Sequence, residues 1–88
     1  MPSHANADEI REFVKREYIV PARLRGDTVI RVNSGEVHNA LGYVNRYPAV
    51  CGAIGTRRFQ TLCNVEQVSR EGPTNGADVY FTFRILAN

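Results

Sequence analysis

The sequence predicts a small mixed α+β domain with elements in the order helix, strand, helix, helix, strand, strand. Three observations support this prediction. Apolar residues recur at helical spacing near the N-terminus and again in the middle of the chain. Residues 28–32 are β-branched and alternating, and from Phe59 onward the apolar period changes to two. Because 88 residues supply only one hydrophobic core, we expect 1–88 to be a single domain.

The composition is that of an ordinary globular domain, with 43% apolar and 23% charged residues. No stretch reaches the roughly twenty apolar residues that span a bilayer, and the polar, acidic N-terminus lacks the pattern of a signal peptide. We therefore expect a cytoplasmic protein without a membrane partner. Residues 1–6 precede the first helix and are expected to be flexible.

The first helix is expected to begin at Asn6, because Glu9 follows three residues later, as in a capping box. Apolar residues within 10–14 then give the helix one inward face. Pro21 is expected to close the helix or to force an extended turn. Residues 28–32 follow as a short strand.

Two further helices are expected in the middle of the chain. The second begins at Asn33, a good N-cap, and ends at Gly42, which suits the left-handed position after a helix. The third covers about 46–55, since Pro48 suits a first helical turn and Gly55 would stop the helix.

The C-terminal third predicts a β-hairpin. Apolar residues alternate from Phe59 to Val68, with an interruption near Asn64, and 79–86 alternates with one strongly apolar face. The segment 69–78 between them contains Gly-Pro and Asn-Gly pairs, which are typical of turns. It is therefore expected to be the hairpin loop.

This order of elements resembles the winged helix-turn-helix fold, in which a three-helix core carries a small antiparallel sheet and the hairpin loop is the wing. The resemblance covers roughly residues 7–86 and rests on element order and length. The segment PARLRGDTVIRVNSGEVHNALGYVNRYPAVCGAI is also similar to small bacterial and archaeal proteins of uncharacterised function. It shares with them a Gly-acid-aliphatic-His step and an Asn-Arg-x-Pro turn. That second resemblance implies no activity.

A locally basic region lies in the middle of the chain. No acidic residue occurs between Glu36 and Glu66, whereas Arg46, Arg57 and Arg58 do. Arginine favours planar, bidentate contacts with phosphate or guanine. Alternatively, these arginines pair with the acidic residues of the first helix, as surface charges usually do.

DNA-binding winged helices place the third helix in the major groove and contact phosphates with the preceding helix and the wing. The resemblance therefore implies a module that binds double-stranded DNA, such as a transcriptional regulator or an accessory to DNA processing. The candidate contacts, carried over by position, are Ser34, His38, Asn45, Arg46, Tyr47, Thr56, Arg57, Arg58, Arg70, Thr74 and Asn75. The helix middle, AVCGAIG, offers no long polar side chain, so base readout would come from its ends.

Several of these residues also have a structural interpretation. Asn45 and Arg46 suit adenine and guanine edges, but Asn45 would equally cap the third helix. Tyr47 would contact a phosphate or serve as a hydrophobic staple, and His38 would be a satisfied surface or core histidine. The net charge of +2 predicts weak binding by a monomer, so a homodimer or larger assembly would supply further contacts.

Other function classes find less support. The sequence shows no acid–base pair, activated nucleophile or metal-ligand spacing, so we expect neither an enzyme nor a metal, cofactor or small-molecule site. Cys51 and Cys63 match no zinc pattern, and we expect free buried thiols rather than a disulfide or a metal site. The alternative function is a winged helix that contacts proteins without binding DNA, because fold does not fix function.

Overall fold

The computed structural model describes residues 6–87. In chain order the elements are α1 (Ala7–Val14), the π-helical turn η1 (Lys15–Ile19), α2 (Val20–Arg25), β1 (Val29–Asn33), α3 (Ser34–Ala40), α4 (Tyr47–Ile54), α5 (Arg57–Cys63), β2 (Val65–Glu71) and β3 (Tyr80–Ile85). Of residues 1–6, which were expected to be flexible, only Asn6 is among the described residues. Its side chain caps α1 by accepting the backbone N–H groups of Asp8 and Glu9.

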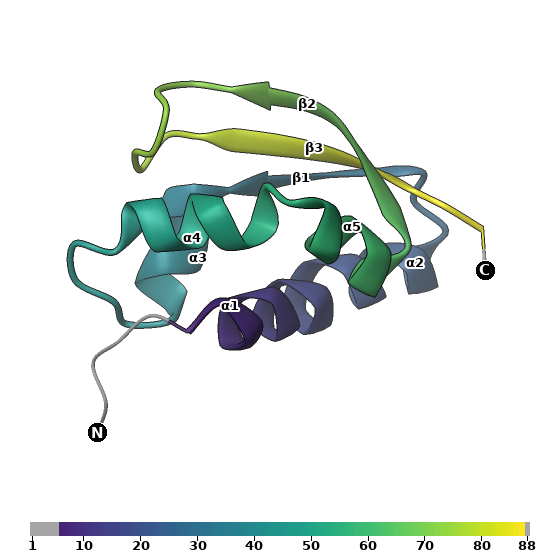
Figure 1. Ribbon diagram of the computed structural model, residues 1–88. Coiled ribbons are helices and arrows are strands. Elements are labelled where there is room, and N and C mark those ends of the chain that lie inside the picture. Colours follow the sequence, from purple (N-terminus) through teal and green to yellow (C-terminus); the bar gives the residue numbers. More distant parts are fainter. Residues whose placement is uncertain (1–5, 88) are drawn as a thin grey trace.

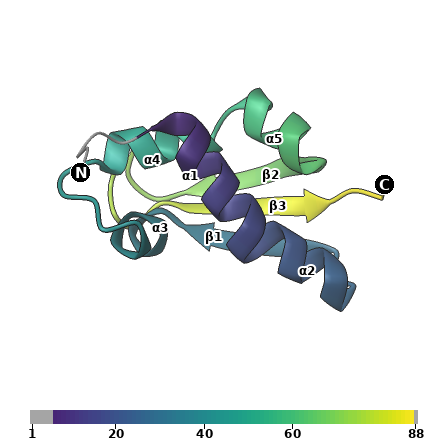
Figure 2. The ribbon, with the colours of Figure 1, turned by 90° about the horizontal axis from the view of Figure 1, so that it is seen from below.

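The strands form an antiparallel sheet in the order β1-β3-β2. All helices lie on one face of this sheet, as Figure 1 shows. Seen from below in Figure 2, α1 crosses the sheet, α4 and α5 lie along the flank that carries β2, and α3 and α2 lie along the flank that carries β1. The predicted mixed α+β class with a small antiparallel sheet is confirmed.

The hydrophobic core lies between the sheet and the helices. On β3 the predicted alternation is confirmed, because Phe81 and Phe83 are fully buried while their neighbours face outward. The rings of Phe59 and Phe83 pack with centroids 5.1 Å apart, which joins α5 to the sheet. Within residues 6–87 no helix is long and apolar enough to cross a membrane.

The first helical region is longer than expected, because Pro21 does not end it. In η1 the Val20 N–H bonds to the carbonyl of Lys15, five residues back, so the hydrogen-bond register has already shifted before Pro21. Pro21 then lies in the first turn of α2, where its missing N–H is tolerated. The helix ends at Gly26, whose φ of 83° is left-handed.

Residues 57–63 form a helix, so the strand predicted from Phe59 is wrong in this part. Thr56 caps α5 by accepting the Phe59 N–H at 3.4 Å, and Asn64 ends it in the left-handed conformation with φ of 53°. Phe59 and Cys63 are both buried. Their spacing of four places them on one face of a helix as well as on one face of a strand, which is why alternation misled.

The hairpin loop is also shorter than predicted. The strand β2 continues through residues 69–71, so the loop covers 72–79 rather than 69–78. The helices α3 and α4 agree with prediction: Asn33 caps α3, Gly42 follows it with φ of 72°, and Gly55 ends α4.

Candidate nucleic-acid interface

Most of the predicted contact residues gather around the two ends of α4. Asn45 and Arg46 precede this helix, and Thr56 separates it from α5, which opens with Arg57 and Arg58. All of these except Thr56 are exposed. In Figure 2 both α4 and α5 lie along the flank that carries β2.

The residue before the start of α4 adopts an unusual conformation. Asn45 has φ of 53°, in the left-handed region that asparagine tolerates better than most residues. The N-cap of α4 is Arg46, and its side chain makes no capping hydrogen bond. The structural interpretation of Asn45 as the cap is therefore wrong. Within residues 6–87 the Asn45 side chain has no hydrogen-bond partner, which leaves its amide available.

His38 is buried, with 2% of its surface exposed, so the prediction that it contacts phosphate is wrong. Its Nε2 accepts the backbone N–H of Arg46 at 3.0 Å. Its ring stacks on Tyr47 with centroids 3.9 Å apart and planes 17° apart. The ring of Tyr43 meets it edge-on at 6.0 Å. His38 therefore contacts the start of α4: it accepts the N–H of Arg46, and its ring stacks on Tyr47.

Ser34 is also buried, and it too is unavailable to a phosphate. Its hydroxyl donates to the carbonyl of Gly76 at 2.6 Å and accepts the Val79 N–H at 3.2 Å. The Gly35 N–H bonds to the carbonyl of Ala77 at 3.0 Å. The bond from Gly35 satisfies a backbone donor of the first turn of α3, which lacks a partner within the helix. Together the three bonds tie the hairpin loop to α3.

The loop tip remains open to solvent. Thr74 and Asn75 are exposed, as a phosphate contact requires. Arg70 reaches the same loop from β2, because its guanidinium donates to the carbonyl of Thr74 and lies 5.0 Å from the ring centroid of Phe81. Arg70 thus braces the loop while remaining exposed.

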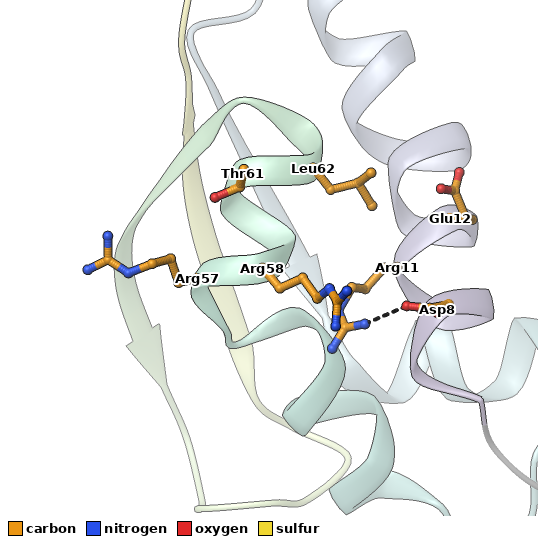
Figure 3. A pocket seen from close by; sticks show the side chains of 7 residues that line it. All are labelled: Asp8, Arg11, Glu12, Arg57, Arg58, Thr61 and Leu62. Carbon is orange, nitrogen blue, oxygen red and sulfur yellow. Dashed lines mark hydrogen bonds and ion pairs between the residues drawn. The ribbon is translucent and has the colours of Figure 1, made fainter.

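Arg57 and Arg58 extend in different directions from α5 (Figure 3). Arg58 points toward α1, into a cleft of about 690 Å³ between α1 and α5. Arg57 points away from α1. Within residues 6–87 neither side chain forms an ion pair, although Asp8 lies across the cleft paired with Arg11 at 2.9 Å. The alternative interpretation, in which these two arginines pair with the acidic first helix, is therefore not supported.

One exposed polar residue of this flank was missed from sequence. Thr61 stands one helical turn after Arg57 on α5 and is exposed. Its spacing of four from Arg57 would have placed the two on one helix face, but only if 57–63 had been recognised as helical. Thr61 extends the candidate surface along α5.

The two cysteines are free and buried, as predicted. Burial raises the pKa of the Cys63 thiol to about 11 and also raises the pKa of Cys51. Both thiols are therefore protonated near neutral pH and poorly nucleophilic. Across the described part of the chain, no cluster of three or more His, Cys, Asp or Glu side chains is arranged to hold a metal ion.

Comparison with known protein families, with curated proteins and with solved structures finds no match to this chain.

Proposed function

We propose that this chain is a winged helix that binds double-stranded DNA. The binding face comprises α4, the segments at its two ends, the exposed side of α5 and the tip of the hairpin loop. Two features of the fold support this proposal: the antiparallel sheet β1-β3-β2, and the helices α3 and α4, which together with α5 lie between β1 and β2 in chain order. A role as a transcriptional regulator or as an accessory to DNA processing would use the same face.

The observation that carries the proposal is the uneven pairing of the arginines. On the proposed face, Arg46, Arg57, Arg58 and Arg70 have no carboxylate partner within residues 6–87. Elsewhere the ion-paired arginines are Arg11, Arg16, Arg25, Arg31 and Arg84. The remaining arginine, Arg23, is bonded to three backbone carbonyls. Arg46, just before α4, and Arg57 and Arg58, at the start of α5, therefore offer guanidinium groups without an ion pair, which suit the phosphates of a DNA backbone.

The shape of α4 favours close approach to a groove. Its exposed residues Pro48 and Gly52 are one turn apart and carry little side-chain bulk. Long polar side chains stand only at its ends, where Asn45 and Arg46 would read adenine or guanine edges. Such an interface would gain most of its affinity from phosphate contacts and little from the helix middle.

A titration of labelled duplex DNA at low and moderate salt tests this proposal. We expect affinity to fall with salt, with a log–log slope of about −0.9 for each phosphate contact. Arg46→Ala and the double variant Arg57→Ala/Arg58→Ala should weaken binding and flatten that slope. Matched controls are Arg25→Ala and Arg16→Ala/Arg25→Ala, which remove the same charge from arginines paired with Asp27 and Glu17.

Two results would count against the proposal. One is the absence of any complex with any duplex at low salt. The other is an equal loss of affinity in the control variants, which would mean that only net charge matters. Circular dichroism of each variant establishes that the fold is retained.

One observation favours a second candidate function, contact with another protein. Leu24 on α2 is 83% exposed, and Val20, one turn earlier on the same helix, is 38% exposed. Both residues belong to α2, which lies on the flank opposite α4 in Figure 2. A second copy of the chain docked there would form a homodimer and leave the α4 face free. Sedimentation should then show a dimer that Leu24→Glu dissociates, whereas a wild-type monomer at every concentration excludes this docking.

A further inference from the structure

We propose that His38 is a positioning residue. Its neutral imidazole fixes the turn that leads into α4 by accepting the Arg46 N–H, and protonation of Nε2 breaks this bond and loosens the turn. The positioning stands on the structure alone. Its effect on DNA affinity rests on the proposed function, so the two are tested by separate measurements.

His38 holds both ends of the turn that leads into α4. At one end its backbone carbonyl accepts the Tyr43 N–H at 3.2 Å. At the other end its ring Nε2 accepts the Arg46 N–H at 3.0 Å. Asn45 lies between these bonds in the left-handed conformation, with φ of 53°.

The ring also takes over a capping role. The Arg46 N–H is one of the donors at the start of α4 that have no partner within the helix. The side chain of Arg46, the N-cap residue, makes no capping hydrogen bond. The backbone N–H of Arg46 is satisfied by Nε2 of His38, a residue of α3. Stacking on Tyr47 fixes the plane of the ring, and its 2% exposure keeps water from replacing the bond.

The hydrogen bond requires one particular protonation state. Nε2 can accept the Arg46 N–H only when the imidazole is neutral and its proton is on Nδ1. Nδ1 faces the Oδ1 of Asn39 at 3.4 Å, an acceptor that suits this tautomer. A second proton, on Nε2, would make this nitrogen a donor that faces the Arg46 N–H, and the hydrogen bond between them would be lost.

The surroundings of the ring offer no compensating carboxylate. The connecting turn contributes Arg46, a cation, and Tyr43, whose hydroxyl is engaged by Glu9 of α1 at 2.6 Å. From α4 the ring meets Tyr47. Among residues 6–87 no acidic side chain bonds to the imidazole. Protonation would therefore leave a cation beside Arg46 and free the turn.

Nuclear magnetic resonance of the full chain, with His4→Ala making His38 the single histidine, tests the positioning between about pH 8 and about pH 5. At high pH we expect the Nδ1–H tautomer, read from the ring nitrogen shifts. The Arg46 amide shift should move with the same midpoint as the ring. In His38→Gln, whose side chain offers a carbonyl acceptor but does not titrate, the Arg46 amide shift should not change with pH, and the amide should stay protected from hydrogen exchange. In His38→Phe, which keeps a stacking ring without an acceptor, the Arg46 amide should exchange faster at every pH.

The same samples, titrated with duplex DNA, test the consequence. Wild-type affinity should weaken by about three- to tenfold as His38 protonates, the change expected from losing one hydrogen bond. An added positive charge alone would strengthen binding, so the sign is diagnostic. His38→Gln should show no such loss. An Nε2–H tautomer, or an Arg46 amide that ignores the ring titration, overturns the positioning. If no duplex binds, the proposed function fails. The ring nitrogen shifts and the Arg46 amide shift then still decide whether His38 positions the turn.

Discussion

The Ser34 hydroxyl donates a hydrogen bond of 2.6 Å to the carbonyl of Gly76, which joins the first turn of α3 to the hairpin loop. Residues that are 42 positions apart in sequence are thereby fixed to each other. The hairpin loop that would contact DNA is consequently held against α3, and its exposed tip is fixed relative to this helix.

Replacing Ser34 by alanine should destabilise the fold through this bond. The Val79 N–H is buried and donates to the Ser34 hydroxyl, so Ser34→Ala leaves it without an acceptor. We expect the free energy of unfolding to fall by about 1–3 kcal/mol, measured by urea denaturation. Ser69→Ala, on the solvent-facing side of β2, should change it by less than about 0.5 kcal/mol. Equal midpoints for the two variants would refute the structural role of Ser34.

Two glycines should respond in opposite ways to alanine. A Cβ on Gly35 would stand 2.5 Å from the backbone oxygen of Ala77, so Gly35→Ala must push the loop away and destabilise the fold. Gly52 is exposed on α4 with nothing within 4 Å of its Cβ position, and Gly52→Ala should stabilise by about 0.5–1 kcal/mol. Thermal denaturation of both variants checks this, and a stabilised Gly35→Ala would contradict the packing of the loop on α3.

The helix α5 should depend on its cap. The Thr56 hydroxyl accepts the Phe59 N–H and donates to the carbonyl of Ala53 at 3.1 Å. Thr56→Ala should therefore cost about 1 kcal/mol of stability, whereas Thr56→Ser, which keeps the hydroxyl, should cost much less. Urea unfolding followed by circular dichroism distinguishes them. If serine and alanine gave the same loss, capping would not explain why 57–63 is helical.

The sequence allowed prediction of elements whose signals are local. The caps Asn6 and Asn33, the stop at Gly55 and the alternation of β3 depend on neighbouring residues alone. The helix α5 was missed because buried residues four apart satisfy both periods, and Asn64 ends a helix where an interrupted strand was expected. Contacts between segments that are distant in the sequence could not be predicted in this way.

The burial of two candidate site residues illustrates that limit. Ser34 and His38 carry polar groups on a short helix, which suggests an exposed surface. Their partners Gly76 and Arg46 come from segments that only the tertiary fold brings against α3. The exposed positions Asn45, Arg57 and Asn75, in contrast, follow from turn and helix-end signals in the sequence.

Stability at alkaline pH should depend on Tyr18. Its hydroxyl donates to the Glu36 carboxylate at 2.9 Å, and burial, followed by Glu36, raises the pKa of Tyr18 from 10.0 to about 12. Because the pKa is higher in the folded than in the unfolded chain, this stabilisation is complete below pH 10.0 and is lost as pH rises toward about 12. Tyr18→Phe should lower stability at neutral pH and show a smaller alkaline loss.

Urea unfolding at a series of pH values measures this effect. Tyr80→Phe is the control, because within residues 6–87 the Tyr80 hydroxyl forms no hydrogen bond and its ring stacks under Arg31 at 4.1 Å. We expect the control to keep the wild-type profile. An alkaline loss in Tyr18→Phe as large as that of wild type would assign the effect to other groups.

Amide shift mapping during a DNA titration tests whether the α4 flank binds duplex DNA. We predict that salt-sensitive shifts are confined to residues 45–58, Thr61, Arg70 and the loop tip at Thr74 and Asn75. Amides of β1 and of α2, on the other flank, should stay unchanged. Shifts centred on β1, α2 or the outer face of the sheet, or no shifts with any duplex at low salt, would contradict the account.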